Sequence, residues 1–413
     1  MTVPSRRYRV LLVATHPVQY AAPTFRLLAG DERFDPLVAY CSLDGAERAL
    51  DPDFGVEIQW DIPLLDGYPW IHVPNISQRL GLGRFLGLFN PGLWRLARRG
   101  SFDAIVAYTS YRHASFWTLV VAAKTSGTAL LFGTDAHTLE PRDHKNWKLQ
   151  LKCRAWPWLF RLADVVTVPS SATSALMRSL GIPAERIVLT PYVVHNEWWL
   201  RQAGSVNRTA TRAQWGIPPD GLVVLFSAKL QTWKRPLDLL LAFARANVAN
   251  AYLVFAGDGA LRAALEAEAK RLGIVGRVRF LGFLNQSQLP AVYCSADLLV
   301  LPSEYEPFGV VVNEAMLCGL PVVTSDQVGA ARDLIVTGRT GFVYPVGDVE
   351  SLAGTLRTIL TDQTLLHVMG AAARERIQSW SPERNVDALL GAVETAIALR
   401  GTSRRGASQC SVP

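Results

Sequence analysis

Hydrophobic residues in this chain occur in short runs that alternate with longer stretches in which apolar residues recur every third or fourth position. Short apolar runs are typical of strands buried on both faces, and the longer period is typical of helices packed on a core. In the first half, the runs predict strands at Val10–Ala14, Ala104–Tyr108, Ala129–Phe132, Val165–Val168 and Ile187–Thr190. The stretches between them predict helices, among them Ser115–Thr125 and Ser171–Leu180.

The second half of the chain shows the same alternation. A polar joint near Asn196–Asn207 separates it from the first half. Strands that alternate with helices indicate parallel, doubly wound sheets, so we expect two such domains that face a cleft at the carboxyl ends of their strands. The predicted strands are Val223–Ser227, Leu253–Ala256, Val278–Leu281, Leu298–Leu301 and Val322–Thr324, and the predicted helices are Leu237–Ala246, Ala260–Leu272, Gln286–Cys294 and Val310–Leu317.

The last part of the chain is helical by its pattern. Ser381 followed by Pro382 suits the start of a final helix. The predicted helices are Asp348–Leu360, Gln363–Trp380 and Asn385–Leu399. The resemblance described below implies that this last helix crosses back onto the first domain. The predicted organisation is an N-terminal domain over 1–200, a C-terminal domain over 201–380, a final helix over 381–399 and a disordered basic tail over 400–413.

Composition is typical of a globular protein with large cores. The chain has 413 residues, enough for two or three domains, with 49% hydrophobic and 19% charged residues. No apolar run approaches the roughly 20 residues that span a bilayer, and the first run precedes no cleavage-site pattern, so we interpret it as a strand and not as a signal peptide. The five cysteines include no C-x-x-C pair, which favours a reduced, cytoplasmic protein without a structural metal.

Positive charge is concentrated in one part of the chain. The net charge is +7, but the segment 79–161 alone holds thirteen Lys and Arg against four acidic residues, with aromatic residues interleaved. Such a surface suits peripheral contact with an anionic membrane surface, at the inner face of the membrane. Solvated helix faces with the aromatic residues in the core explain the same pattern equally well. Nucleic-acid binding is disfavoured, because the chain contains no recognised binding module.

The most informative motif lies in residues 304–323. Glu306 and Glu314 stand eight positions apart, the first expected in a loop and the second in a helix. Pro307 and Gly309 are expected to open that helix, because proline fits a first helical turn and glycine allows close approach to the backbone. The N–H groups at a helix start bind anions, whereas carboxylates bind sugar hydroxyls. The motif therefore predicts a ligand that contains both phosphate and sugar.

This segment resembles the Glu-x7-Glu signature of retaining glycosyltransferases with the GT-B fold, of the family-four or "glycosyl transferases group 1" type. That family includes sucrose synthase and many bacterial capsule and lipopolysaccharide enzymes. The spacing, Phe-Gly, Glu-Ala and Gly-x-Pro-Val-Val all recur together here. The resemblance implies that Glu306 holds the donor sugar and that Glu314 accepts hydrogen bonds from ribose hydroxyls. It implies a diphosphate contact at the helix start, at Phe308, Gly309 and Val310.

Two lysines follow the first strand of the second half. Lys229 and Lys234 match the Arg and Lys that hold the donor diphosphate in the family, with Lys229 as a departure from the usual Arg. A leaving diphosphate needs positive groups, and Lys keeps the charge without the bidentate geometry. Two exposed loop lysines are the alternative interpretation. Leu281 and Gly282, at the end of the third strand, are implied neighbours of the nucleotide base.

The first half offers candidates for contact with the transferred sugar and the acceptor. The resemblance implies a functional residue after the third strand, either His137 or Asp135. A loop histidine bonded to backbone is the alternative interpretation of His137. His113, at a neighbouring strand end, is another candidate for the sugar or the acceptor. His16 and Gln19 follow the first strand and are expected on the acceptor side.

The chain departs from the family in two loops. The Gly-rich loop that many relatives carry after the first strand is absent, and Pro191-Tyr-Val-Val-His195 stands where relatives often have Pro-Asn-Gly-Val-Asp. The first departure leaves the acceptor contacts open. The pair Asp51 and Asp53 has the spacing of a metal-binding Asp-x-Asp, but it lies between Pro and Gly residues, and we interpret it as a turn.

Together these observations predict a glycosyltransferase. The resemblance covers residues 8–399, most strongly 220–345, and implies an α/β protein of GT-B fold with two Rossmann-like domains. The expected reaction moves a sugar from a nucleotide-sugar donor to a glycan or lipid-linked acceptor in polysaccharide biosynthesis, with retention of configuration. No cofactor and no metal are expected, because the nucleotide sugar is a substrate. A sugar-nucleotide epimerase of the same fold and a non-catalytic nucleotide-sugar-binding subunit remain as alternatives.

Overall fold

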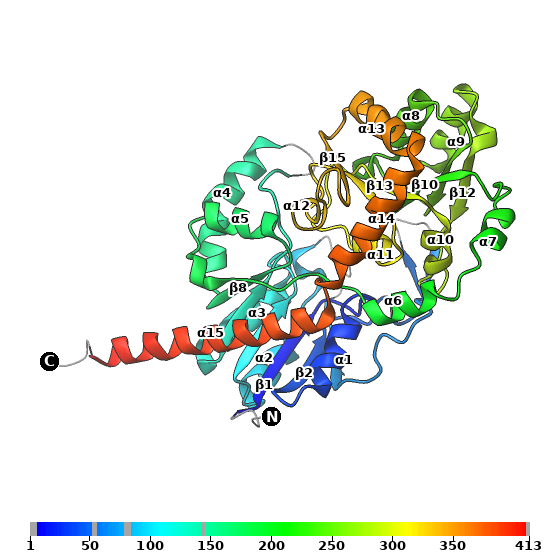
Figure 1. Cartoon of the computed structure of the whole chain (residues 1–413). Helices are drawn as coiled ribbons and strands as arrows, with labels where there is room; N and C mark the ends of the chain where they lie inside the picture. Colours follow the sequence, from blue (N-terminus) through cyan, green and yellow to red (C-terminus); the bar gives the residue numbers. More distant parts are fainter. Residues whose placement is uncertain (1–5, 52–55, 78–83, 142–144, 410–413) are drawn as a thin grey trace. The chain divides into compact units, whose positions relative to one another are not determined.

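The computed structural model describes residues 6–51, 56–77, 84–141 and 145–409. The chain divides into two units, each built on a parallel β-sheet with helices around it (Figure 1). Two parallel, Rossmann-like sheets are the α/β architecture that the strand and helix pattern predicted. Unit 1 contains Met1–Glu47, Pro63–Tyr192 and Pro382–Pro413, and unit 2 contains Arg48–Ile62 and Val193–Ser381.

The sheet of unit 1 has seven strands, which are β1 Tyr8–Ala14, β2 Phe34–Tyr40, β5 Trp70–His72, β6 Ala104–Tyr108, β7 Ala129–Gly133, β8 Val165–Val168 and β9 Ile187–Leu189. They are parallel and lie in the order β5-β2-β1-β6-β7-β8-β9. All five predicted strands of this half are present. The sequence pattern missed β2, whose apolar run is interrupted by Asp35 and Pro36, and β5, a three-residue edge strand with exposed side chains.

Helices cover both faces of this sheet: α1 Ala22–Gly30 and α15 Pro382–Gln409 on one face, and α2 Gly92–Arg99, α3 Ala114–Ser126, α4 Asn146–Arg161 and α5 Ser171–Ser179 on the other. Successive side chains of a strand point to opposite faces. Leu11 and Val13 therefore join the core under α2 to α5, whereas Val10 and Leu12 join the core under α1 and α15. Burial on both faces explains why β1 has a continuous apolar run.

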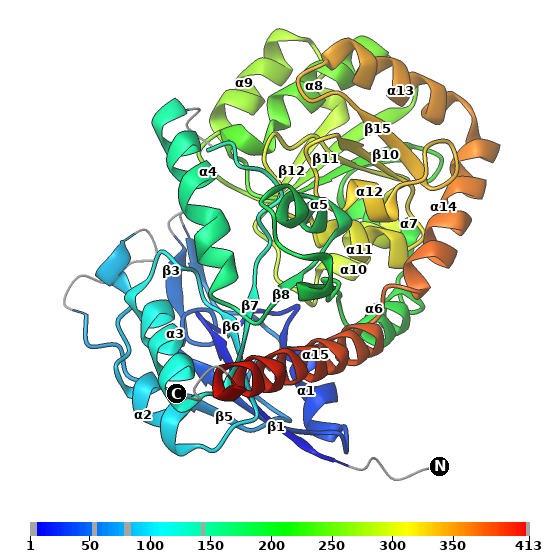
Figure 2. The same ribbon diagram turned by 90° about the vertical axis from the view of Figure 1, so that its left-hand side faces the viewer.

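Helix α15 is longer than the sequence predicted. Figure 2 shows it alongside α1 in unit 1, where Val386, Leu389 and Val393 enter the core at helical spacing. The last helix was expected to end at Leu399, but α15 continues to Gln409. The Arg400 guanidinium lies 2.8 Å from Asp164 Oδ2, so the first basic residue of the expected tail holds the helix to the sheet.

The sheet of unit 2 has six strands, which are β10 Leu222–Ser227, β11 Ala251–Ala256, β12 Val278–Gly282, β13 Leu298–Leu301, β14 Val322–Ser325 and β15 Gly341–Tyr344. They are parallel, in the order β12-β11-β10-β13-β14-β15, and only β15 was not predicted from the sequence. The helices are α6 Asn196–Ala203, α7 Arg208–Gln214, α8 Pro236–Ala246, α9 Arg262–Arg271, α10 Leu289–Ser295, α11 Val311–Leu317, α12 Ala331–Leu334, α13 Val349–Thr361 and α14 Gln363–Gln378.

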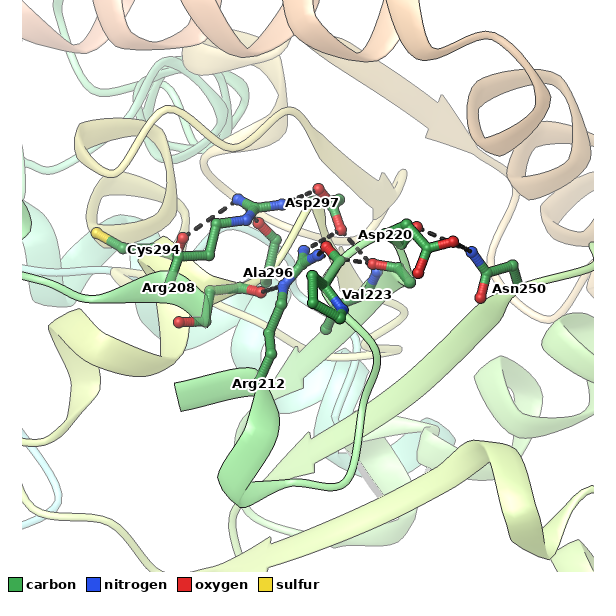
Figure 3. A network of polar contacts seen from close by, with 11 residues as sticks. Arg208, Arg212, Asp220, Val223, Asn250, Cys294, Ala296 and Asp297 are labelled. Atoms are coloured by element: carbon green, nitrogen blue, oxygen red, sulfur yellow. Dashed lines mark hydrogen bonds and ion pairs between the residues drawn. The ribbon is translucent and has the colours of Figure 1, made fainter. Parts of the chain in front are cut away.

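A buried ion pair fixes the amino ends of the central strands of unit 2 (Figure 3). Arg212 of α7 is only 3% exposed, and its guanidinium donates to Asp297 Oδ2 at 2.5 Å and to the carbonyls of Gly221 and Ser295 at 2.7 and 2.9 Å. The same Asp297 oxygen accepts from the Val223 N–H at 2.7 Å. The pair therefore links α7 to the starts of β10 and β13.

Residues Arg48–Ile62 belong to unit 2, although the sequence analysis placed them in an N-terminal domain of residues 1–200. This segment includes the antiparallel pair β3 Ala49–Asp51 and β4 Val56–Ile58. Asp61 accepts from the Ser287 N–H at 3.1 Å, and the Asn285 amide donates to the Gln59 carbonyl at 2.7 Å. Polar side chains make these contacts, and because such side chains follow no periodic pattern, the contacts cannot be predicted from hydrophobic periodicity.

Candidate functional site

The order of strands in unit 2 reverses between β10 and β13. In open parallel sheets, ligands bind outside the carboxyl ends of the strands at such a point. The loop that follows β10 carries Lys229 and Lys234, and the loop that follows β13 carries Glu306. The topology therefore brings together three residues that the sequence analysis assigned to a donor.

Lys234 and Glu306 form an ion pair between the Lys234 ammonium and Glu306 Oε2. Their side chains are 17% and 13% exposed, so the pair is largely shielded from water. A second pair lies next to it, since Arg235 donates to Glu304 Oε2 at 2.8 Å and to Asp238 Oδ2 at 2.6 Å. The backbone also connects the two loops, because the Glu304 N–H donates to the Trp233 carbonyl at 2.8 Å.

The segment from Glu306 to Val310 is a loop, and α11 begins only at Val311. The expectation that Pro307 opens the helix is therefore wrong. The Glu306 carbonyl accepts from the Gly329 N–H at 2.9 Å and the Phe308 carbonyl from the Ala330 N–H at 2.8 Å, which holds this stretch outside helical geometry. Phe308 is buried, and Val310 is the N-cap residue of α11.

Gly309 is required by the backbone at this loop. Its φ is +94°, which L-residues with a Cβ rarely adopt. A Cβ at this position would also lie 3.1 Å from Leu301 Cδ2 and 3.2 Å from Glu306 Cγ. The glycine lets the loop turn closely against the end of β13 and the side chain of Glu306.

Glu314 is buried behind this loop, with 6% of its surface exposed. The Tyr293 hydroxyl of α10 donates to Glu314 Oε2 at 2.9 Å and is also hydrogen-bonded to Ser227 Oγ at 3.0 Å. Burial raises the pKa of Glu314 to about 7, although hydrogen bonds from Tyr293 and Gln286 act in the opposite direction. The Glu314 carboxyl group therefore titrates near neutral pH. Hydrogen bonds of the Tyr293 hydroxyl connect it to Ser227 at the end of β10.

Lys229 lies in a loop that two glycines shape. These are Gly257 and Gly259, in the loop that follows β11. A Cβ at Gly257 would lie 2.1 Å from the Ala228 carbonyl oxygen, and one at Gly259 would lie 2.7 Å from that of Leu230. Only glycine lets these two backbone segments run so close together. Lys229 itself is half-buried, and so is Lys234, so neither is the fully exposed loop lysine of the alternative interpretation.

Leu281 and Gly282 end β12 at the edge of the same sheet. The Gly282 carbonyl accepts from the Gly257 N–H at 2.9 Å, so the end of β12 joins the loop beside Lys229. The ring centroid of Phe283 lies 6.3 Å from that of Trp60. Trp60 belongs to Arg48–Ile62, the segment from the first half of the chain that is part of unit 2. Sequence reasoning missed Trp60 because it precedes the region of strong resemblance and lies in no periodic element.

The candidates of unit 1 follow three neighbouring strands, β1, β6 and β7. His16 and Gln19 follow β1 and are half-buried, and burial lowers the pKa of His16, which favours its neutral form. His113 follows β6, is 4% exposed and stands at the N-cap position of α3. After β7, Asp135 is exposed and His137 is half-buried. The strand order also reverses between β1 and β6, so these side chains share one edge of the sheet.

Within residues 6–51, 56–77, 84–141 and 145–409, no group of three or more His, Cys, Asp or Glu side chains is arranged to hold a metal ion. Asp53 and the side chain of Asp51 lie outside the described part of the structure. The backbone of Asp51 ends strand β3, so the interpretation as a turn stays a prediction only for Asp53.

Two family models match the chain, one for each half. Residues 5–193 match the glycosyl transferase 4-like domain, and residues 207–376 match glycosyl transferases group 1. The chain is 35% identical over 219 residues to a D-inositol 3-phosphate glycosyltransferase of Geodermatophilus obscurus, which covers 50% of this chain and 47% of that protein. It is 33% identical over 216 residues to the N-acetyl-alpha-D-glucosaminyl L-malate synthase of Bacillus anthracis, covering 52% and 55%. The chain thus spans about half the length of the curated relatives it matches.

Solved structures share the fold over nearly the whole chain. Anabaena Alr3699/HepE in complex with UDP and glucose superposes with a TM-score of 0.70 at 21% identity, covering 92% of this chain and 98% of that one. WaaG, a glycosyltransferase involved in lipopolysaccharide biosynthesis, superposes with a TM-score of 0.67 at 19% identity, also covering 92% and 98%. At these identities the likeness establishes the GT-B fold.

Proposed function

Because this chain belongs to the glycosyl transferases group 1 family, we propose that it transfers a sugar from a nucleotide-sugar donor to a glycan or lipid-linked acceptor, with retention of configuration. The family models match both halves of the chain, so the two parts of a GT-B enzyme are represented. A structural neighbour was solved with UDP and glucose and again with UDP-glucose, which supports a nucleotide sugar as the donor class.

The observation that carries this proposal is the Lys234–Glu306 ion pair at the strand reversal of unit 2. A donor diphosphate beside Lys229 and Lys234 competes with Glu306 for the Lys234 ammonium. Glu306 is then released to accept hydrogen bonds from the donor sugar. The two ammonium groups stabilise the charge that develops on the leaving diphosphate, in a site where burial strengthens electrostatic interactions.

Glu314 and the loop before it complete the proposed donor site. Glu314 accepts hydrogen bonds from the ribose hydroxyls, and Phe308, Gly309 and Val310 contribute backbone contacts to the diphosphate. With retention of configuration, the acceptor attacks from the face that the diphosphate leaves, and no protein nucleophile is required. Leu281 and Gly282 are assigned to the base.

Unit 1 supplies the remaining groups in this proposal. His137 or Asp135 hydrogen-bonds the transferred sugar or orients the acceptor hydroxyl, with His113 as the third candidate. His16 and Gln19 are assigned to the acceptor. The lowered pKa of His16 keeps its imidazole neutral, so it can accept a proton or a hydrogen bond from an acceptor hydroxyl.

A lipid-linked acceptor is supported by the surface of α4. Trp147, Leu151 and Trp158 are 61%, 57% and 58% exposed and recur at helical spacing. The helix carries Lys148 and Lys152 and no acidic residue. Amphipathic helices of this composition bind anionic membrane surfaces. No helix in the described part of the chain combines the length and hydrophobicity needed to cross a bilayer.

The proposal is tested by incubating the purified protein with radiolabelled UDP-, GDP- and ADP-sugars in the presence of a membrane extract. Transfer of label to a lipid or glycan fraction is expected with one donor, together with release of the matching nucleoside diphosphate. Epimerisation of the donor without transfer would support the alternative enzyme of the same fold. Binding without turnover would support a non-catalytic subunit.

A further inference from the structure

Cys294 and Cys318 are neighbours at the ends of two helices of unit 2. The Tyr293 hydroxyl of α10 donates to Glu314 Oε2 of α11 at 2.9 Å, which fixes these helices against each other. Cys294 follows Tyr293, and Cys318 lies four positions after Glu314, on the same side of the helix. The two side chains are hydrogen-bonded to each other, both are partly exposed, and both are free thiols.

Positive charge surrounds this thiol pair. Cys318 lies on the wall of a cavity of about 680 Å³ that Arg208 and Arg374 also line. Arg208 donates to the Cys294 carbonyl at 3.3 Å, and Figure 3 shows the Cys294 sulfur next to this contact. The hydrogen bond from Cys318 lowers the pKa of Cys294, and both arginines act in the same direction against the effect of burial. Nearby arginines favour the thiolate, which is the reactive form of cysteine.

We propose that Cys294 and Cys318 are a modification site at which a peroxide reversibly forms a disulfide that weakens donor binding. The Cys294 thiolate attacks one peroxide oxygen and the other leaves as hydroxide, which gives a sulfenic acid. The Cys318 sulfur then attacks the Cys294 sulfur, and the sulfenic oxygen leaves as water. In total, two thiols and one hydrogen peroxide give one disulfide and two waters, and the two electrons lost by sulfur reduce the peroxide.

The disulfide acts on Glu314 because of where the sulfurs lie. An S–S bond is about 2.05 Å long, well inside the hydrogen-bonding contact of two thiols, so its formation draws the ends of α10 and α11 together. Tyr293 and Glu314 lie one residue and one helical turn from the sulfurs, so their hydrogen bond is displaced. This consequence rests on the proposed function, since it is the proposed donor site that contains Glu314.

The other two cysteines in the described part of the chain lack this arrangement. Cys41 is fully buried in unit 1, and burial raises its pKa to about 12. Cys153 is exposed on α4 of unit 1. Cys410 lies outside the described residues. Cys153 is therefore the matched control, because it is accessible but belongs to the other unit.

The covalent step is tested on the full chain with hydrogen peroxide and mass spectrometry. Trypsin leaves both cysteines in one peptide, because no Lys or Arg lies between Arg279 and Arg332, so a protease that cleaves after glutamate is used. Glu304, Glu306 and Glu314 lie between the two cysteines and separate them. The expected result is a linked peptide pair, two hydrogens lighter than the sum of its parts, that dithiothreitol separates. Cys294→Ser and Cys318→Ser abolish it, and Cys153→Ser retains it.

The effect on the donor site is tested by titrating UDP into reduced and oxidised protein. We expect oxidation to weaken binding by roughly 2- to 10-fold, the equivalent of one hydrogen bond, and dithiothreitol to restore it. The inference is overturned if peroxide gives only a sulfinic acid or a link to Cys153, or if the linked protein binds UDP as tightly as the reduced one. If the reduced protein binds no UDP, GDP or ADP, that result contradicts the proposed function instead. The mass-spectrometric detection of the linked peptide then still tests whether Cys294 and Cys318 form a disulfide.

Discussion

Lys234 pairs with Glu306 across 72 positions of the chain, from loops that follow two adjacent strands of one sheet. The pair places a half-buried cation and a half-buried anion where a diphosphate and a sugar would need opposite charges. Before the ligand binds, each side chain neutralises the charge of the other. A ligand that carries both groups can replace the pair without leaving either charge unpartnered.

Lys234→Ala is expected to reduce donor affinity and turnover, because it removes positive charge from the diphosphate and leaves Glu306 without its partner. Hydrogen bonds to charged groups are worth about 1.5–3 kcal/mol, so UDP affinity should fall at least tenfold in calorimetry. Lys234→Arg is the matched control and should keep most of the affinity, since it keeps the charge. Equal UDP affinity of Lys234→Ala and the wild type would place the diphosphate elsewhere.

Glu314→Gln is expected to change how stability depends on pH. Burial raises the pKa of Glu314 from 4.5 to about 7, so between these values the folded chain holds a proton that the unfolded chain has released. The free energy of unfolding therefore falls as pH rises from 4.5 to about 7, by about 3 kcal/mol in total. Above pH 7 this loss of stability is complete.

Glutamine keeps the shape of the side chain without titrating. Urea unfolding of both proteins between pH 4.5 and 8 should show the wild type losing stability relative to Glu314→Gln as pH rises. If the free energies of unfolding of the two proteins changed with pH in the same way, folding would not raise the pKa of Glu314. Glu314→Gln should also weaken donor binding, by about 1.5–3 kcal/mol if the carboxylate accepts from the ribose hydroxyls.

Arg212→Ala is expected to destabilise unit 2 severely. It leaves Asp297 without its buried partner and removes donors from the carbonyls of Gly221 and Ser295, and the loss of one member of a buried pair typically costs about 3–5 kcal/mol. Arg208→Ala is the matched control, because Arg208 pairs with the same Asp297 but is 44% exposed, so its loss should cost less. Equal unfolding midpoints of the two variants would contradict this ranking.

The surface of α4 is expected to bind anionic vesicles. Binding should be absent on neutral vesicles and fall steeply with salt, because charge attraction is screened over about 8 Å at physiological ionic strength. Trp147→Ser with Leu151→Ser should lower binding in a flotation assay. Arg95→Ser, Arg98→Ser and Arg99→Ser should lower it further, since all three arginines are exposed on α2.

Val368→Ser is the matched control for the α4 variant, because Val368 is 58% exposed but lies in unit 2. It should leave vesicle binding unchanged, and both variants should leave UDP binding intact. Protein that does not float with anionic vesicles even at low salt would favour a soluble acceptor.

Activity is expected to survive a chelator, because lysines supply the positive charge in the proposed donor site. Turnover should be measured with and without EDTA, and then with added Mn²⁺ or Mg²⁺. Loss of activity with EDTA and recovery with Mn²⁺ would make Asp51 and Asp53 candidates for a metal site.

The central strands of both sheets could be predicted from the sequence because they are buried on both faces and therefore form continuous apolar runs. The elements that the pattern missed lack this feature. Phe34–Tyr40 is interrupted by Asp35 and Pro36, and Trp70–His72 is an exposed edge strand. The end of α15 was misplaced because residues 400–409 are mostly polar and have no apolar period that would predict a helix.

By itself, the sequence determined the α/β class, the two sheets and the residue types of a candidate donor site. These features depend on which residues are apolar and on their local spacing, and both can be read from the order of residues. Only the tertiary structure decided which of those residues meet. It paired Lys234 with Glu306, tied Glu314 to Tyr293 and brought Trp60 to Phe283. It also showed that Pro307 does not open α11, because contacts with Gly329 and Ala330 hold residues 306–310 as a loop. Such contacts join positions far apart in the chain, and the energy that selects them comes from packing and charge compensation, which no local pattern records.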